Sequence, residues 1–356
     1  MKINFIFICL LVIGCKQNDL KDNVNGPLKK PKNIILLIGD GMGISQVSSA
    51  IYYKKSKSNF ERFPIVGLSK TSSSSHKITD SGAGATAISI GEKSYNGSIG
   101  VASDSLEKEL ITKFAKDLGK KIGIISTSAI THATPASFYS HSKSRSNAEE
   151  IAQQINNYSF DFFAGGGLQY FRNRSDSVNL LDILKDDGYY IDTNELQMTK
   201  SKKAIFLLAD DGMPKISEGR SQFLKNASLQ AIEHLKNDNG LFLMIEGSQI
   251  DWGGHANDSE YLISELIDFD NTMGSVLDWA EKDGETLVIV TADHETGGFT
   301  LSANPNKDYN NISPTFSTSG HSGAMVGVFA YGPGAEKFSG IYENTQIHHK
   351  MKMLLK

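Results

Sequence analysis

Residues 33–43 read NIILLIGDGMG, and this stretch sets the fold that we predict. Its apolar, β-branched run over Asn33–Gly39 is typical of a strand that is buried on both faces of a sheet. The run ends in a glycine-rich turn that carries one acid, Asp40. An acid between glycines can reach a bound ion while the backbone turns sharply. The pattern also fits a turn in which Asp40 only caps the next helix, so this stretch alone identifies no site.

Similar apolar runs recur along the chain. They cover Lys121–Ser126, Phe160–Ala164, Ala204–Leu208, Leu241–Ile245, Thr286–Thr291 and Val326–Tyr331. Helical patterns lie between them, and long helices are predicted over Glu218–Asn237, Asn257–Lys282 and Asn344–Leu355. Near-continuous apolar strands that alternate with helices indicate a parallel sheet with both faces covered. The predicted fold is therefore α/β in three layers, with a large, mostly parallel central sheet and helices on both faces.

Acidic and histidine side chains follow several of these strands. Glu246 and Asp251 come after the run LFLMI, and Asp293 and His294 come after the run TLVIVT. In such sheets, ligand sites form at the carboxyl ends of the strands. We therefore expect these four residues and Asp40 to form one site.

Two further histidines fit the same site. Asp251 and His255 are four residues apart, so one helical turn can present both to a single ion. His321 lies in the segment SGHSG, just before the last predicted strand. Each histidine alone also fits a core or surface position. Together with the acids at the strand ends, they predict a site for divalent metal ions.

A candidate nucleophile lies in the segment TDSGAGATA, residues 79–87. Ser81 precedes small residues that look like the start of a helix, and a helix N-terminus favours a phosphate group. No histidine base lies beside Ser81 in the sequence, so a metal ion could activate it by stabilising its alkoxide. Ser81 also fits a residue that only caps a tightly packed helix.

The N-terminus has the features of an export signal. Lys2 precedes an apolar run over Ile3–Ile13 that is too short to span a bilayer as a mature helix. Residues 12–15 read VIGC, which resembles a bacterial lipobox. We predict a lipoprotein signal peptide over residues 1–14, a lipid on Cys15, a flexible tether over residues 15–32 and a periplasmic or cell-envelope location. The alternative is a plain signal peptide with an incidental cysteine.

The remaining residues, 33–356, are predicted to form one domain. The two cysteines, Cys9 and Cys15, lie outside it, so a metal site in the domain must use His, Asp, Glu and hydroxyl groups. A net charge of -4 argues against a general attraction to nucleic acid or to a membrane surface. Asn304–Ser319 is predicted to be a small surface insertion near the site. His141 is predicted to be structural, and surface positions are predicted for His76, His234, His348 and His349.

Taken together, the motifs GDGMG, TDSGAGATA, HATPASFYSHSKSR, EGSQIDWGGH, TADHETGG and SGHSG closely resemble those of the alkaline phosphatase family. The resemblance covers most of residues 33–333. It implies hydrolysis of phosphate monoesters of broad type through a covalent phosphoserine, with two Zn²⁺ and one Mg²⁺ per chain. It also implies a homodimer.

The resemblance assigns roles by matched position. Ser81 corresponds to the phosphorylated serine, and Arg145 to the arginine that holds the phosphate oxygens. The ligands of the first zinc ion correspond to Asp251, His255 and His321. Those of the second zinc ion correspond to Asp40, Asp293 and His294, together with Ser81. The magnesium ligands correspond to Asp40, Thr134 and Glu246.

Two positions depart from the best-known enterobacterial pattern. His132 stands where that pattern has an aspartate near magnesium, and Trp252 stands where it has a lysine near the phosphate. This pair is similar to the variant found in some marine and cold-adapted bacterial enzymes. An imidazole suits zinc or cobalt better than a carboxylate does, so His132 puts the preference of the third site for magnesium in question. Trp252 also fits simple packing at the rim of a pocket.

The sequence leaves two rival functions to test. One is another hydrolase of the same superfamily, such as a sulfatase or a phosphodiesterase. Gly-Ala-Gly-Ala after Ser81 does not fit the C/S-x-P-x-R motif of sulfatases, and Arg145 favours monoesters over diesters. The other rival is a metal-stabilised phosphate-capturing lipoprotein, which would have no need for a nucleophile among metal-ligand motifs.

Overall fold

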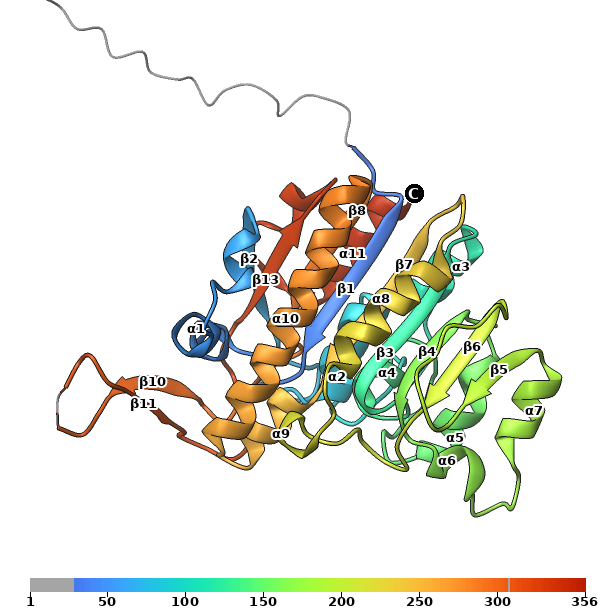
Figure 1. The fold of residues 1–356 in the computed structure, drawn as a ribbon, viewed down its shortest axis with the longest axis horizontal. Helices are drawn as coiled ribbons and strands as arrows, with labels where there is room; N and C mark the ends of the chain where they lie inside the picture. The colour runs from blue at the N-terminus through green and yellow to red at the C-terminus, as the bar shows by residue number, and fades with distance from the viewer. Residues whose placement is uncertain (1–28, 307) are drawn as a thin grey trace, which may run out of the picture.

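The computed structural model describes residues 29–306 and 308–356. One sheet of ten strands runs through the molecule in the order β14-β2-β13-β8-β1-β7-β3-β4-β6-β5 (Figure 1). Its strands are β1 (Asn33–Gly39), β2 (Ile65–Lys70), β3 (Lys121–Ala129), β4 (Phe162–Gly166), β5 (Tyr189–Asp192), β6 (Lys203–Leu207), β7 (Leu241–Gly247), β8 (Thr286–Thr291), β13 (Val326–Tyr331) and β14 (Gly340–Glu343). Two small antiparallel sheets pair β9 (Glu295–Thr296) with β12 (His321–Ser322) and β10 (Thr300–Ala303) with β11 (Ile312–Thr315).

The large sheet is almost entirely parallel. Strand β13 runs antiparallel to both of its neighbours, β2 and β8, and every other strand pair is parallel. The predicted α/β class with a mostly parallel central sheet is therefore confirmed. The carboxyl ends of the central strands meet at one edge of the sheet, as this topology requires.

Helices cover both faces of the sheet, as predicted. They are α1 (Ile44–Tyr53), α2 (Ser81–Ile90), α3 (Ile111–Asp117), α4 (Ala133–Ala136), α5 (Ala148–Gln153), α6 (Gln169–Arg172), α7 (Leu180–Asp186), α8 (Phe223–Leu235), α9 (Gln249–His255), α10 (Ser259–Asp283) and α11 (Thr345–Leu355). Residues of α2, α3, α5, α7 and α11 pack into one core, and residues of α1, α8 and α10 pack into the other.

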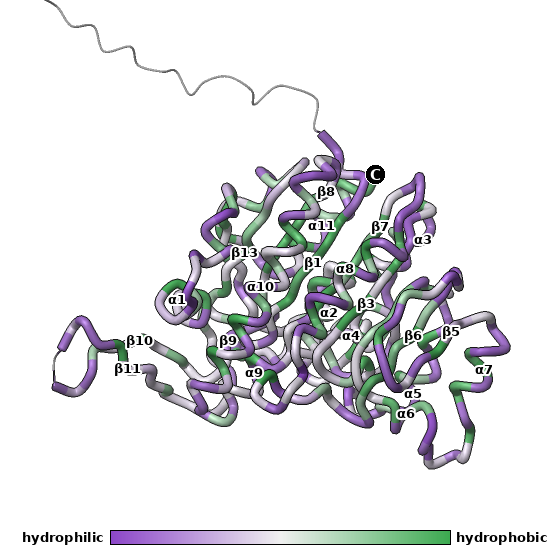
Figure 2. Tube along the Cα trace, in the orientation of Figure 1, coloured by the Kyte–Doolittle hydropathy of each residue, from purple (hydrophilic) through white to green (hydrophobic). Residues whose placement is uncertain are grey.

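Strand β1 shows why its sequence is apolar throughout. Leu36 and Ile38 point into the first core, whereas Ile35 and Leu37 point into the second, because successive side chains of a strand alternate between its faces. A strand covered on both faces therefore has no polar side. Figure 2 shows the resulting hydrophobic trace along the central strands.

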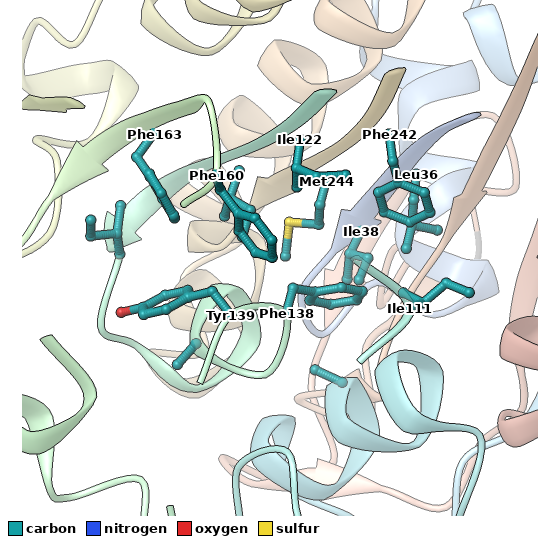
Figure 3. Close-up of a cluster of buried hydrophobic side chains, with 14 of the residues drawn as sticks. Leu36, Ile38, Ile111, Ile122, Phe138, Tyr139, Phe160, Phe163, Phe242 and Met244 are labelled. Atoms are coloured by element: carbon teal, nitrogen blue, oxygen red, sulfur yellow. The ribbon is translucent and has the colours of Figure 1, made fainter. Parts of the chain in front are cut away.

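An aromatic cluster fixes the segment that follows β3. Phe138 and Tyr139, just after α4, are buried beneath the sheet beside Phe160 and Phe163 (Figure 3). The rings of Tyr139 and Phe163 meet edge to face, with centroids 5.5 Å apart. This packing holds α4, which carries Thr134, against the carboxyl ends of the strands.

Two helix starts differ from the prediction by two residues or more. The helix predicted from Glu218 begins at Phe223, because Gly219 and Ser221 have φ angles of 95° and 57°, which a helix cannot accommodate. The helix predicted from Asn257 begins at Ser259, since Asp258 caps it by accepting a hydrogen bond from the Tyr261 N–H.

The prediction that His348 lies at the surface is wrong. Its side chain is buried on the inner face of α11, and its Nδ1 lies 2.9 Å from the Ser89 carbonyl oxygen. His141 is structural, as predicted: its Nδ1 lies 2.7 Å from the Gly100 carbonyl oxygen and its Nε2 lies 2.9 Å from the Tyr158 hydroxyl.

The segment predicted as a surface loop over Asn304–Ser319 forms part of a hairpin. Strands β10 and β11 pair from Thr300 with Thr315 to Ala303 with Ile312, and the hairpin projects from the body of the protein (Figure 1). Its second strand leads back toward His321. The predicted surface insertion therefore contains the second strand of this hairpin, and the base of the hairpin lies near the candidate site.

The predicted signal peptide and the lipidated Cys15 lie outside the described residues, as does the predicted tether up to residue 28. At the end of that tether, the Lys32 N–H donates to the Glu285 carbonyl oxygen, so pairing with the domain begins there. Among the helices of residues 29–306 and 308–356, none has both the length and the apolar character that a bilayer span needs.

Candidate active site

The candidate site forms where three neighbouring central strands end. Strand β1 pairs with β7 and β8, and Ile38 lies opposite Glu246 on one side and Thr291 on the other. Asp40 and Asp293 follow two residues beyond these paired positions, so strand register alone brings Asp40, Glu246 and Asp293 together. All three are fully buried, as expected for residues at the centre of a covered sheet.

The first group of candidate ligands contains Asp251, His255 and His321. Asp251 and His255 lie one turn apart on α9, and His321 comes from the short strand β12. The two Nε2 atoms lie 3.1 Å apart, and the Asp251 carboxylate oxygens lie 3.4 Å and 3.6 Å from His255 and His321, respectively. One ligand atom from each residue can therefore reach a single ion.

The second group surrounds His294. Its Nε2 lies 3.4 Å from Asp40 Oδ1, 3.3 Å from Asp293 Oδ2 and 3.1 Å from Ser81 Oγ. Ligand atoms of Asp40, Asp251 and His294 also lie within 4.8 Å of one another, so Asp251 borders both groups. Asp40, Asp293 and the Ser81 hydroxyl are thus gathered around His294 Nε2, as the predicted second set requires.

The third group contains Asp40, His132 and Glu246, whose ligand atoms lie within 4.8 Å of one another. Thr134 joins it, because its hydroxyl donates to Asp40 Oδ2 over 3.3 Å. The Ser126 hydroxyl bonds to Glu246 Oε2 and leaves Oε1 free to face the group. All the residues predicted for a third metal site therefore lie together.

Ser81 is the first residue of α2, and Asp80 is its N-cap. The Asp80 carboxylate accepts a hydrogen bond from the Ala83 N–H over 3.0 Å, which fixes the start of the helix. Gly84 must be small, because a Cβ there would lie 2.9 Å from the Asp293 carbonyl oxygen. The helix N-terminus thereby packs directly against the acidic groups and directs its partial positive charge at the site.

Arg145 contacts Asp80, the residue that precedes Ser81. Its Nη1 donates to Asp80 Oδ2 over 3.0 Å, and its Nη2 lies 3.2 Å from His132 Nε2. Burial raises the pKa of Asp80, but the Ala83 N–H and the charge of Arg145 outweigh burial and lower it overall. Asp80 therefore stays ionised and holds the guanidinium in place.

Trp252 lies next to His132 on the exposed side of the site. The two rings meet edge to face, with centroids 6.1 Å apart. The backbone of Gly212 packs against the indole, since a Cβ at that position would lie 2.5 Å from Trp252 Cη2. The structure thus places Trp252 beside His132, whose Nε2 lies 3.2 Å from Arg145 Nη2.

In the protein without metal ions, burial disfavours the ionised form of several carboxyl groups of the site. Burial, reinforced by neighbouring carboxylates, raises the pKa of Asp40 well above its usual value. Burial raises the pKa of Asp293 to about 6 and that of Glu246 to about 7. One buried oxygen of each of these three carboxyls has no hydrogen-bond partner: Asp40 Oδ1, Asp293 Oδ2 and Glu246 Oε1. Bound cations would satisfy these oxygens, so the residues fit a metal centre.

Sequence reasoning missed a set of supporting residues. Asp80 holds Arg145, Ser126 holds Glu246, and Thr296 bonds to Asp251 over 2.5 Å. Asp80 carried a usable signal, because an aspartate just before a predicted helix start is a common N-cap. The two hydroxyl residues carried no such signal, since only the folded chain shows what they contact.

A family model described as alkaline phosphatase matches residues 31–315 and 302–356 of this chain. The chain belongs to the alkaline phosphatase family. Alkaline phosphatase 3 of Bacillus subtilis (strain 168) is 41% identical over 292 residues, which cover 76% of this chain. The match spans 63% of that relative's length.

Solved structures of the family are closely similar to this one. The alkaline phosphatase from the Antarctic bacterium TAB5 has a TM-score of 0.91 and is 53% identical, and the match covers 92% of this chain and 99% of that chain. A variant of it, with a histidine replaced by aspartate, has a TM-score of 0.90 at 51% identity and the same coverage. That variant was solved with Mg bound in the M3 site. The resemblance seen in the sequence motifs is thereby confirmed.

Proposed function

We propose that this protein hydrolyses phosphate monoesters of broad type through a phosphoserine on Ser81, with two zinc ions and one magnesium ion at the site. The observation that carries the proposal is the position of Ser81. Its Oγ lies at the N-terminus of α2, 3.1 Å from His294 Nε2, among buried carboxyls with unpartnered oxygens. A hydroxyl in this setting suits attack on a phosphorus atom beside metal ions.

The zinc ligands follow from the first two groups. Asp251, His255 and His321 would hold the first ion, and Asp40, Asp293 and His294 the second. When bound, these ions would supply positive charge that stabilises the attacking and leaving oxygens. Three carboxylates and three imidazoles match the oxygen and nitrogen ligands that zinc takes in proteins.

The third group supports an oxygen-rich site, with Asp40, Thr134 and Glu246 as the proposed magnesium ligands. His132 distinguishes it from an all-oxygen site. Burial and the charge of Arg145 lower the pKa of His132 to about 3, so its imidazole is neutral and can act as a ligand.

Ser81 and Arg145 carry the chemistry that the chain itself performs. The Ser81 hydroxyl loses its proton, and its oxygen attacks phosphorus in line to form the P–Oγ bond. The bond to the leaving group breaks, and the leaving oxygen takes up a proton to give the alcohol. Arg145 binds the non-bridging phosphate oxygens with two parallel N–H groups. Water then attacks the phosphoserine, which releases inorganic phosphate and restores the serine hydroxyl.

His294 is a poor candidate for the base that activates Ser81. Burial, with a contribution from the charge of His321, lowers the pKa of His294 to about 3. An imidazole with so low a pKa takes up a proton weakly near neutral pH. Its Nδ1 lies 3.2 Å from a threonine hydroxyl and not beside a carboxylate, so the arrangement is no Ser-His-Asp triad. This geometry favours metal activation of the serine.

Comparing a monoester with a diester tests the proposed reaction. We expect 4-nitrophenyl phosphate to be hydrolysed about 10²- to 10³-fold faster than bis(4-nitrophenyl) phosphate, or more, because a diester forfeits one charged contact with Arg145 or an ion. The measurement is kcat/KM for both esters. Equal rates would favour a phosphodiesterase, and tight phosphate binding without turnover would favour a binding protein.

Replacing His132 with aspartate tests the third site. The new carboxylate would give this group an additional oxygen ligand, which magnesium prefers over imidazole nitrogen. We expect H132D to retain more Mg²⁺ per chain than the wild type after dialysis, as measured by elemental analysis. The Mg-bound variant of the Antarctic enzyme supports this direction. Lower magnesium retention in H132D would contradict the assignment.

We also propose that the protein forms a homodimer through an apolar face at one end of the sheet. Val66 on β2 is 51% exposed, Ile341 on the edge strand β14 is 65% exposed, and Ile44 at the start of α1 is 43% exposed. Leu68 pairs with both Ile341 and Gly327, and Ile44 packs near Gly327, so these side chains share one face. Exposed apolar residues gathered on one face are typical of an interface.

Replacing Ile341 with glutamate should convert the dimer to a monomer, because a charge in the apolar interface must be desolvated. Light scattering after size-exclusion chromatography measures the mass. Ile183→Glu is the matched control, since Ile183 is 49% exposed on α7 at the opposite end of the molecule (Figure 1). A wild-type monomer, or loss of the dimer in the control as well, would contradict this interface.

A further inference from the structure

Each histidine of the two proposed zinc sites has an oxygen beside its Nδ1 atom. His255 Nδ1 lies 2.6 Å from the Ser319 carbonyl oxygen, and His321 Nδ1 lies 2.8 Å from the Thr79 carbonyl oxygen. A carbonyl oxygen only accepts hydrogen bonds, so both histidines carry their proton on Nδ1. Their Nε2 lone pairs then face one another across 3.1 Å, an arrangement that needs a cation between them.

His294 differs, because its Nδ1 faces a side chain. The Thr296 hydroxyl lies 3.2 Å from His294 Nδ1 and 2.5 Å from Asp251 Oδ1. The hydroxyl has one proton to donate, and the Asp251 carboxylate can only accept it. The Thr296 oxygen is therefore left to accept the proton of His294 Nδ1. This leaves His294 Nε2 unprotonated and directed at Ser81 Oγ.

Thr296 thus joins a ligand of one proposed zinc ion, Asp251, to a ligand of the other, His294. The residue is fully buried and its backbone is fixed: its N–H donates to the Gly41 carbonyl oxygen, and its carbonyl oxygen accepts from Gln46 Nε2. It also pairs with His321 in the small β9–β12 sheet. The backbone of Thr296 is thus held in place, and its hydroxyl contacts both Asp251 and His294.

We infer that Thr296 is a positioning residue that couples the two zinc sites, which rests on the metal centre proposed above. Its hydroxyl sets the tautomer of His294 and the orientation of Asp251 at the same time. Outer hydrogen-bond partners of this kind change metal affinity by about 10- to 100-fold when they are removed. Among the three oxygens beside these Nδ1 atoms, it is the one that belongs to a side chain, so a single substitution can remove it.

The test compares Thr296→Val with Thr296→Ser. Valine keeps the shape and loses the hydroxyl, whereas serine keeps the hydroxyl and loses the methyl group that packs on Gly254. Thr272→Val is the matched control, because Thr272 is also fully buried but its hydroxyl has no partner. The readout is zinc dissociation from each purified full-length protein, measured by competition with a chromogenic chelator. Circular dichroism of the chelated proteins checks that all are folded.

We expect T296V to bind both zinc ions about 10- to 100-fold more weakly than the wild type, and T296S and T272V to bind them as the wild type does. Unchanged affinity in T296V would overturn the inference. Equal weakening in T296V and T296S would assign the effect to packing and would also overturn it, as would weakening confined to one ion. A wild-type protein that binds no zinc would instead refute the proposed metal centre itself.

Discussion

Replacing Ser81 with alanine is expected to abolish the phosphoenzyme and to lower kcat by a factor on the order of 10⁴ to 10⁶, the scale of losses seen when a catalytic nucleophile is removed. Ser81 Oγ lies 3.1 Å from His294 Nε2 at the first turn of α2. Without this oxygen no phosphoserine can form, and the ester bond could be cleaved only by attack of water on the substrate itself.

The measurement has two parts. Steady-state hydrolysis of 4-nitrophenyl phosphate gives kcat, and acid quenching with ³²P-labelled substrate detects phosphate bound to serine. Ser89→Ala is the matched control, since Ser89 lies buried on the same helix and its hydroxyl has no partner. If S81A retained wild-type turnover or still formed the phosphoenzyme, Ser81 would not be the nucleophile.

Chelation of the metal ions is expected to abolish activity and to make stability fall as the pH rises above about 6.5. Burial raises the pKa of Asp293 to about 6 and that of Glu246 to about 7, and the pKa of Asp40 is also raised. In an unfolded chain these carboxyls have pKa values of about 4. The folded metal-free protein therefore keeps protons on these carboxyls up to about pH 7 that the unfolded chain has lost.

The buried imidazoles of His132, His294 and His348 act in the opposite direction. Their pKa values are lowered to about 3, 3 and 4, so they lack protons that the unfolded chain keeps up to about pH 6.5, which offsets the carboxyls at lower pH. Above about pH 6.5 this offset ends, so the free energy of unfolding decreases with rising pH.

Thermal unfolding of chelated and metal-loaded protein from pH 5 to pH 8 measures this effect. We expect the Tm of the chelated protein to fall between about pH 6.5 and pH 8, and zinc and magnesium to raise Tm most at the alkaline end. Glu246→Gln should flatten the decline, because it removes the buried acid whose pKa is raised to about 7. Asp278→Asn is the control, since the Asp278 side chain is 63% exposed. A Tm of the chelated protein that increased above about pH 6.5 would contradict the electrostatic account.

The part of the site that strand register determines could be predicted from the sequence. Asp40, Glu246 and Asp293 follow apolar runs that had to be neighbouring parallel strands, and the structure places them together. The contact between Ser81 and His294 could not be derived in this way. These residues are 213 positions apart, and no local pattern specifies how the start of α2 packs against the end of β8.

The errors in the predicted fold have local causes. Ser221 has a left-handed backbone conformation, which cannot be predicted from a serine in the sequence, so the predicted start of α8 is too early. His348 could have been placed correctly, because Met351 and Leu355 lie three and seven positions further along α11 and share its buried face. Helical periodicity outweighs the general preference of histidine for partly exposed positions.

The carbonyl groups beside His255 and His321 have a consequence for how this protein can diverge. Every amino acid supplies the same main-chain oxygen, so the support of His255 does not depend on which side chain stands at position 319, which is exposed to solvent. Sequence drift at such a position can leave the imidazole orientation untouched as long as the chain keeps its path. Hydrogen bonds that orient a functional side chain can therefore be retained among related proteins even when the residue that supplies the carbonyl oxygen is not conserved.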